Sequence, residues 1–175
     1  KSQFNFQGPK PDLKIHPLIN SINPLSWIKA ALWLKSHKPD LVISRFWLPF
    51  IGPSLGSVLK LSGLNPKIPL VALCDNVIPH ENRFGDRFLT RYFLKSNNQF
   101  LVMSNSVGKD ISTFVNNPKI NYHPHPVYDQ FGDLLPKKDA LQMLQLNPKK
   151  KYVLFFGFIR KYKGLDLLIK ALPTI

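Results

Sequence analysis

Short runs of apolar residues alternate along the chain with longer segments in which apolar residues recur every three or four positions. Short runs rich in Val, Ile, Leu and Phe predict strands, and the longer periodic segments predict helices. Strands that alternate with helices are typical of a parallel sheet with helices on both faces, so the pattern predicts a Rossmann-like α/β domain. The predicted strands lie at 40–46, 69–74, 99–104 and 119–124, and the predicted helices at 23–40, 52–61, 85–96 and 106–116.

The first of these helices has a clear start. Asn23 is a suitable N-cap residue and Pro24 suits the first helical position. We expect the strand that follows, at 40–46, to be buried. Four apolar residues of the helix fall on one face and are expected to pack: Leu25, Ile28, Ala31 and Leu32.

The composition of the sequence changes from about Pro124 to Lys150, and we predict a domain boundary near residues 117–130. A Pro-rich connection and a helix at 137–146 precede the apolar run 152–158, which reads as a central parallel strand. A helix follows at 165–172. We therefore predict two domains with a cleft between them, the second represented by its first strand and helix. The predicted divisions are 1–125, 126–150 and 151–175.

The chain carries a large positive charge, with 24 Lys and Arg against 10 Asp and Glu, a net +14. Such a surplus favours anionic partners: nucleic acid, the phosphates of a sugar nucleotide, or a membrane surface. The single cysteine, Cys74, excludes an internal disulfide and fits a reducing cytoplasm. No apolar run is long enough to span a bilayer. Because the chain opens at Lys1 and stops within a predicted helix at Ile175, we expect a fragment of a longer protein.

Basic residues gather where the strand at 152–158 should pass into the next helix. Gly157 falls at the predicted end of the strand, Gly164 at the start of the helix, and Arg160 and Lys163 in the turn between them. Ligands of parallel α/β folds sit at such turns, and a helix N-terminus with cations suits a phosphate. The pattern therefore suggests a diphosphate clamp, although basic residues are also common in ordinary surface turns. The sequence has neither a P-loop nor a G-x-G-x-x-G fingerprint.

Polar residues follow the predicted strand at 69–74. Asp75, Asn76, His80 and Glu81 would lie past its carboxyl end, where they could line a cleft or simply form a solvated loop. For Cys74, in the apolar strand itself, we expect a plain buried thiol.

Further candidates end other strands. Arg45 and Trp47 follow the first strand, and Trp47 could stack on a sugar or only seal the domain core. His123 and His125 have a spacing that places both rings on one side of an extended segment. A metal site would need another ligand, and none is evident.

The stretch YVLFFGFIRKYKGLDLLIKAL at 152–172 resembles the start of the nucleotide-sugar-binding domain of glycosyltransferase family 4, the glycosyl transferases group 1. KPDLVISRF, FLVMSNSVGKDI and INYHPHPVYDQF resemble upstream segments of that family more loosely. Each motif is weak, but their order and spacing together are specific.

The resemblance implies a GT-B fold, with the acceptor on the N-terminal domain and a nucleoside diphosphate sugar on the second. It implies transfer of the sugar to an acceptor hydroxyl with retention of anomeric configuration, without a metal or other cofactor. Lys163 and Gly157 would contact the donor diphosphate. The family's arginine directly follows the strand glycine, where this chain has Phe158, so we expect Arg160 to take that role.

On the acceptor side, many members end a strand with His-Asp, where this chain has Cys74 and Asp75. Asp75 and His80 are therefore the candidate catalytic residues. Possible cleft or acceptor contacts are Arg45, Trp47, Asn76, Glu81 and His125.

The resemblance further suggests synthesis of envelope polysaccharide or glycolipid in the cytoplasm, on a saccharide or lipid-linked acceptor, with peripheral attachment at the inner membrane face as one expectation. Residues 27–38 could dock on an anionic membrane, although a core helix with a solvated basic face explains them equally. These 175 residues alone are expected to be inactive. The alternatives are a sugar-nucleotide epimerase of the same architecture and a basic nucleic-acid-binding protein, for which no recognition motif is present.

Overall fold

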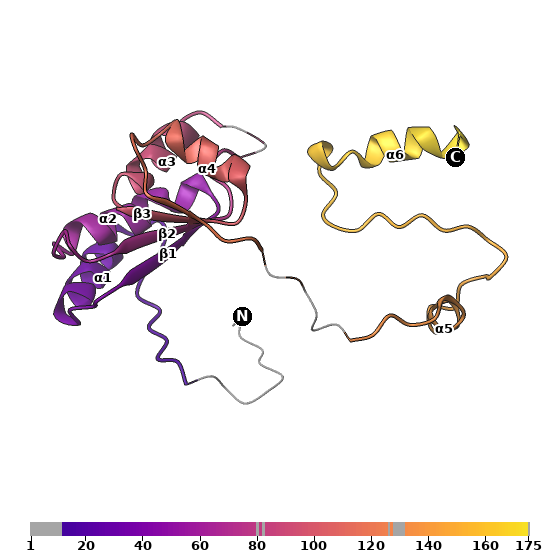
Figure 1. The fold of residues 1–175 in the computed structure, drawn as a ribbon, viewed down its shortest axis with the longest axis horizontal. Coiled ribbons are helices and arrows are strands. Elements are labelled where there is room, and N and C mark those ends of the chain that lie inside the picture. Colours follow the sequence, from indigo (N-terminus) through magenta and orange to yellow (C-terminus); the bar gives the residue numbers. More distant parts are fainter. Residues whose placement is uncertain (1–11, 80, 82, 126, 128–131, 175) are drawn as a thin grey trace. The chain divides into compact units, whose positions relative to one another are not determined.

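The chain divides into two compact units, Lys1–His125 and Pro126–Ile175. The computed structural model describes residues 12–79, 81, 83–125, 127 and 132–174 (Figure 1).

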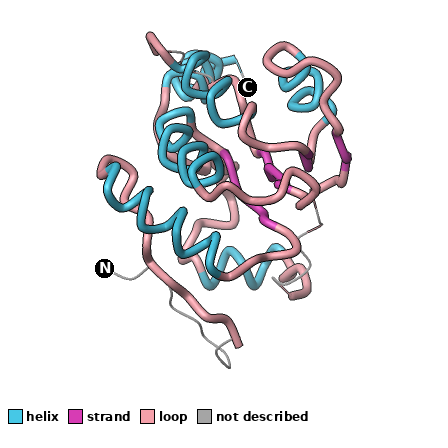
Figure 2. The backbone as a smooth tube through the Cα atoms, turned by 90° about the vertical axis from the view of Figure 1, so that its left-hand side faces the viewer, coloured by secondary structure: helices cyan, strands magenta, loops and turns pink. Residues whose placement is uncertain are grey.

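The first unit contains one parallel sheet, as the alternating pattern predicts. Its described strands lie in the order β1-β2-β3-β4, so neighbours in the sequence are neighbours in the sheet. Val42 pairs with Leu70, and Phe100 with Ile120. Figure 2 shows how short these strands are beside the helices. The strands are β1 (Val42–Phe46), β2 (Leu70–Cys74), β3 (Gln99–Val102) and β4 (Ile120–Tyr122).

The four helices predicted for this unit are confirmed, although their ends differ from the predicted ones by a few residues. The Asn23 side chain accepts a hydrogen bond from the Leu25 backbone N–H at 3.0 Å, and Pro24 opens α1. Ser104 caps α4 in the same way, accepting from the Ser106 N–H at 3.2 Å. The elements are α1 (Pro24–Ser36), the 3₁₀ turn η1 (Pro49–Ile51), α2 (Gly52–Leu61), α3 (Asp86–Leu94) and α4 (Asn105–Ser112).

The helices that connect the strands pack on one face of the sheet, which corrects the prediction of helices on both faces. Leu59 of α2, Phe93 of α3 and Ile111 of α4 belong to one core cluster with the strand residues Phe46 and Ala72. A right-handed crossover between each strand and its next neighbour places every connecting helix on the same side. Because the strands follow one another in order, the connecting helices form one hydrophobic core cluster with a single face of the sheet.

Strand β1 is buried on one side only, whereas the sequence predicted a buried strand. Ser44 and Phe46 are buried, and Phe46 stacks on Phe93 with ring centroids 4.5 Å apart. Ile43, which points the other way, is 62% exposed. Because β1 is an edge strand with helices on one face, its apolar run cannot be covered on both sides.

The predicted packing face of α1 is also wrong except at Ala31. The buried residues of α1 are Ala30 and Ala31, which pack with Val58 of α2. Small side chains let α1 approach α2 closely, so the alanine face packs and the larger side chains turn outward. Leu25, Ile28 and Leu32 are 68%, 47% and 60% exposed.

The described residues of the second unit form helices without a core, and none of them is buried. The helices predicted at 137–146 and 165–172 are confirmed as α5 (Lys137–Met143) and α6 (Leu165–Ala171), with 3₁₀ turns η2 (Lys161–Lys163) and η3 (Leu172–Thr174). The strand predicted at 152–158 is not formed, and Phe156 there is 91% exposed. A strand needs a neighbour for its backbone hydrogen bonds, and the described part of this unit offers none. The predicted first strand–helix unit of a second domain is therefore present only as its helix.

No helix within the described residues combines the length and apolar character needed to cross a bilayer.

Candidate functional site

The carboxyl ends of β1 and β2 bring together residues that lie far apart in the sequence. Arg45 is next to last in β1, and Asp75 directly follows β2. The register pairs Phe46 with Cys74, and the Asp75 backbone N–H continues the ladder to the Phe46 carbonyl at 3.0 Å. This edge of a parallel sheet is where ligands bind in α/β folds.

An ion pair joins the two strand ends. Nε of Arg45 donates to Oδ2 of Asp75 at 2.8 Å. The Arg45 side chain is 62% exposed and the Asp75 side chain 22% exposed, so the pair lies at the surface with its carboxylate turned inward. An exposed pair of this kind adds little to stability. Because the Arg45 side chain is largely exposed and only its Nε–H contacts Asp75 in this ion pair, the other guanidinium N–H groups can reach a ligand.

The second carboxylate oxygen of Asp75 is the unusual feature of this site. Oδ1 is buried and has no hydrogen-bond partner among the described residues. Buried polar atoms are nearly always paired, because an unpaired acceptor gives up its hydration without compensation. A ligand hydroxyl or N–H group would supply the missing donor once the Asp75 carboxylate turned toward the surface.

Trp47 completes this site. Its side chain is 54% exposed and lines a pocket of about 330 Å³ together with Arg45 and Asp75. The exposure argues against the alternative that Trp47 only seals the core. An aromatic face beside a carboxylate and a guanidinium is a combination that suits a sugar ring, which offers a C–H face and hydroxyl edges.

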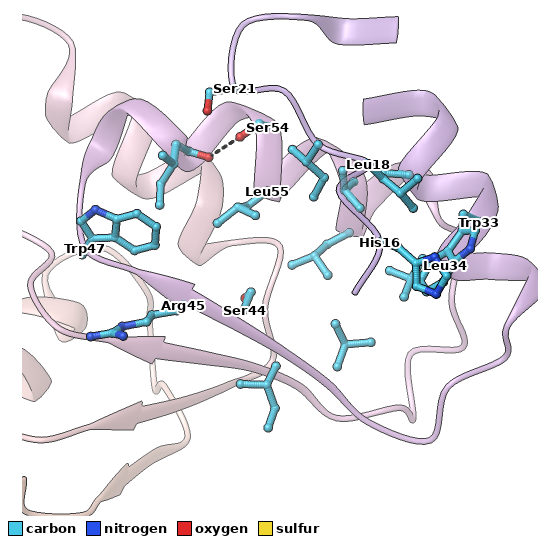
Figure 3. Close-up of a pocket in the computed structure, with 17 residues that line it drawn as sticks. His16, Leu18, Ser21, Trp33, Leu34, Ser44, Arg45, Trp47, Ser54 and Leu55 are labelled. Carbon is cyan, nitrogen blue, oxygen red and sulfur yellow. Dashed lines mark hydrogen bonds between the residues drawn. The ribbon is translucent and has the colours of Figure 1, made fainter. Parts of the chain in front are cut away.

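A larger hollow of about 480 Å³ runs from Trp47 and Arg45 along the open side of β1, between α1 and α2 (Figure 3). His16 and Trp33 lie at its other end, with ring centroids 4.8 Å apart. Most of its lining is aliphatic, including Leu34, Leu55 and other residues of the two helices. This hollow could not be predicted from the sequence, because no local pattern shows that the segment around His16 returns to α1.

The other predicted site residues of the first unit differ in how far they are buried. Asn76 is partly buried directly after Asp75, and Glu81 is exposed. His80 lies outside the described residues. His125 is exposed at the end of the unit. No group of three His, Cys, Asp or Glu side chains in the described part of the chain is placed to hold a metal ion.

The Cys74 thiol is fully buried, as the sequence predicted. Burial, and secondarily the charge of Asp75, raises the pKa of Cys74 to about 12. A thiol with this pKa is protonated at neutral pH and is a poor nucleophile, so Cys74 contributes packing to the site and no reactive group.

In the second unit, the candidate residues of the diphosphate clamp lie in and before the turn that precedes α6. Gly164 adopts a left-handed φ of 70° as the N-cap of α6, and the Lys163 N–H donates to the Arg160 carbonyl at 2.9 Å. Both cationic side chains are exposed, and Nζ of Lys163 lies 5.3 Å from the centre of the Tyr162 ring. Gly157 has a φ of 126°, which side-chain-bearing residues rarely adopt. At the position of the family arginine, Phe158 is 85% exposed.

Comparisons with protein-family models, curated proteins and solved structures found no match to this chain. The resemblance of residues 152–172 to glycosyltransferase family 4 therefore stays a prediction. The pocket at the ends of β1 and β2 brings together three of the predicted site residues of the first unit, Arg45, Trp47 and Asp75.

Proposed function

We propose that the chain belongs to a retaining glycosyltransferase that transfers a sugar from a nucleoside diphosphate sugar to an acceptor hydroxyl. The observation that carries the proposal is the pocket at the carboxyl ends of β1 and β2, with the unpartnered Oδ1 of Asp75 beside Arg45 and exposed Trp47. An aromatic face, a carboxylate and a guanidinium are suited to a saccharide or lipid-linked acceptor.

In this proposal, Asp75 accepts a hydrogen bond from an acceptor hydroxyl and Arg45 holds the carboxylate in place. The bond from the anomeric carbon to the diphosphate oxygen breaks, a bond to the acceptor oxygen forms on the same face of the sugar, and the hydroxyl proton passes to the departing diphosphate oxygen. His80 is the second candidate for a catalytic role on sequence grounds alone.

The donor side of the proposal rests on the turn before α6. Arg160 and Lys163 precede the N-terminus of α6. Gly164, which has a positive φ, lies between Lys163 and the first residue of that helix. Cations there would stabilise the charge that develops on the leaving diphosphate, which is the main electrostatic requirement of the reaction. The resemblance of residues 152–172 supports this assignment, and it suggests a role in envelope polysaccharide or glycolipid synthesis at the cytoplasmic side of a membrane.

The test uses the complete polypeptide that contains these residues. A panel of radiolabelled sugar nucleotides is offered with saccharide and lipid-linked acceptors, and the anomeric configuration of the product is determined by NMR. We expect acceptor-dependent release of nucleoside diphosphate and retained configuration. Inversion would contradict the proposed reaction. Conversion of the donor to another sugar nucleotide without an acceptor would indicate an epimerase in place of a glycosyltransferase.

Substitution of the two cations tests the donor side. Arg160→Ala and Lys163→Ala should each weaken nucleoside diphosphate binding about tenfold, as measured by isothermal titration calorimetry. The matched control is Lys161→Ala, an exposed cation of the same turn. Equal losses in all three variants would mean that only the overall charge matters, and the clamp assignment would then fail.

A further inference from the structure

Arg45 has hydrogen-bonding capacity that the fold does not use. Its Nε–H donates to Oδ2 of Asp75 at 2.8 Å, which orients the guanidinium group. The two terminal nitrogens carry the other N–H groups of the side chain, and no hydrogen bond joins them to another described residue. The side chain is 62% exposed, so these N–H groups can be reached from solvent. The fold therefore holds a guanidinium fork at the surface without occupying it.

This fork lies where two hollows of the first unit meet. Arg45 and Trp47 line both the pocket of about 330 Å³ that contains Asp75 and the hollow of about 480 Å³ along β1. Figure 3 shows both side chains at the same end of the larger hollow. Among the described residues that line the two hollows, Asp75 is the only acidic one, and it is bound at the Nε side of the guanidinium. A ligand in the pocket would meet the terminal nitrogens of Arg45 and the Trp47 ring together.

We propose that the terminal nitrogens of Arg45 bind an oxyanion, a phosphate or carboxylate group that the acceptor sugar carries. The inference rests on the proposed function, because it assigns the acceptor of that reaction to a chemical class. Two parallel N–H groups of a guanidinium match two oxygens of a phosphate or carboxylate, and such paired bonds are stronger than bonds to neutral hydroxyls. Trp47 stacks on the sugar ring in this arrangement, while Arg45 selects its charged substituent.

The charge of the chain favours an anion at this position over a neutral hydroxyl. The sequence carries a net +14, so the field around the molecule attracts anions. Asp75 repels an anion, but its carboxylate lies on the Nε side of the guanidinium and its side chain is only 22% exposed. The repulsion acts across the guanidinium group and partly through solvent, whereas the hydrogen bonds to the terminal nitrogens are direct.

The first test measures binding without catalysis. Hexose 1-phosphates, hexuronic acids and the corresponding neutral hexoses are titrated into the full chain, and NMR follows the Nε–H signal of Arg45 and the indole N–H signal of Trp47. We expect at least one class of anionic sugar to bind about tenfold more tightly than its neutral counterpart. Preference for the phosphates or for the uronic acids identifies which oxyanion the acceptor carries, and either preference supports the proposal.

Substitutions of Arg45 test whether the preference comes from the fork. Arg45→Gln should remove the preference for anionic sugars, and Arg45→Lys should keep only part of it, because lysine retains the charge but not the paired geometry. The matched control is Arg91→Gln, which removes an exposed arginine from the last turn of α3 and changes the net charge equally. It should leave the preference unchanged.

Three binding results would overturn the proposal. One is equal affinity of the wild type for anionic and neutral sugars. Another is a preference for anionic sugars that survives in Arg45→Gln. The third is an equal loss in Arg45→Gln and Arg91→Gln, which would show that only the overall charge attracts the anion.

Kinetics of the complete polypeptide separate this inference from the proposed function. In Arg45→Gln, kcat/KM for an anionic acceptor relative to its neutral analogue should fall about tenfold. Any disturbance of Asp75 by the substitution lowers the rates with both acceptors and cancels in this ratio. Equal kcat/KM values of the wild type for both acceptors would contradict the oxyanion site and leave the proposed transfer intact. Binding of anionic sugars that depends on Arg45, without transfer to any acceptor, would support the oxyanion site and contradict the proposed transfer.

Discussion

Nε of Arg45 lies 2.8 Å from Oδ2 of Asp75, although the two residues are 30 positions apart in the sequence. The pair exists because β1 and β2 run parallel and in register, so their carboxyl ends meet at the same edge of the sheet. It leaves Oδ1 of Asp75 buried and unpartnered among the described residues. The relationship defines the floor of the candidate acceptor pocket.

Substitution of Asp75 should affect activity far more than stability. Asp75→Asn should change the free energy of unfolding by less than about 1 kcal/mol, because the Arg45 partner is 62% exposed and solvent screens the pair. In the complete polypeptide, kcat/KM for the acceptor should fall at least about tenfold, since an amide cannot reproduce the charge of a carboxylate toward a hydroxyl. Urea unfolding and initial rates measure the two effects. Asp40→Asn, at an exposed position before β1, is the control, and unchanged kinetics in Asp75→Asn would remove Asp75 from the site.

The cap of α1 should contribute measurably to stability. Asn23→Ala removes the acceptor for the Leu25 N–H, and we expect the free energy of unfolding to fall by about 1 kcal/mol. Asn23→Asp keeps an acceptor at the same position and should retain most of the stability. Urea unfolding of both variants, with Asn116→Ala as an exposed asparagine outside a helix start, measures the difference. A loss of the same size in Asn23→Asp would indicate that the amide group, rather than the cap, matters.

Features that depend on neighbouring residues could be predicted from the sequence. The helices and strands of the first unit follow from apolar runs and, for α1, from the cap residue Asn23, because caps and periodicity act over a few residues. The strand was predicted at 152–158 because the apolar run there is typical of a central strand. It does not form because a strand needs a neighbouring strand to complete its backbone hydrogen bonds.

Features that depend on packing partners could not be predicted. Periodicity favoured the larger residues of α1 as its packing face, whereas the approach of α2 favoured Ala30 and Ala31. The candidate residues Arg45 and Asp75 were identified singly from their places after strands. Their pairing, and the hollow between His16 and Trp47, depend on sheet register and on the path of the chain before α1. Local sequence patterns contain neither.

The contact between α2 and α3 should not tolerate a side chain at Gly52. A Cβ atom there would lie 2.7 Å from the Leu89 carbonyl oxygen, and a backbone atom cannot move aside as a flexible side chain can. We expect Gly52→Ala to lower the free energy of unfolding by about 1 to 3 kcal/mol. Gly108→Ala is the matched control, because its Cβ would meet only side-chain carbons, the nearest being Cγ2 of Ile120 at 3.6 Å. That substitution in α4 should be neutral or stabilising by up to about 1 kcal/mol, since alanine is the better helix former. Thermal and urea unfolding measure both variants. If Gly52→Ala and Gly108→Ala changed the free energy of unfolding equally, the close approach at Gly52 would be contradicted.

The buried thiol of Cys74 should make stability depend on pH in the alkaline range. Its pKa is about 12 in the folded chain against 9.0 for the ordinary thiol, chiefly because of burial. Between these values the unfolded chain loses a proton that the folded chain keeps, so the thiol's contribution to stability is constant below pH 9 and falls as the pH rises. Cys74→Ala lacks this titration. The stability deficit of the variant, measured by urea unfolding, should therefore be constant at lower pH and shrink above pH 9 by up to about 1.4 kcal/mol per pH unit.

The comparison of wild type and Cys74→Ala isolates the thiol, because the lysines and tyrosines that titrate in the same range are common to both proteins and cancel. A deficit that stays constant across the alkaline range would mean that the thiol ionises equally in the folded and unfolded chains. An independent check uses a thiol reagent at a pH below 9. Cys74 should then react only as fast as the first unit opens, because the side chain is fully buried, and partial urea should accelerate the reaction. Rapid labelling of the native chain would contradict the buried, protonated thiol.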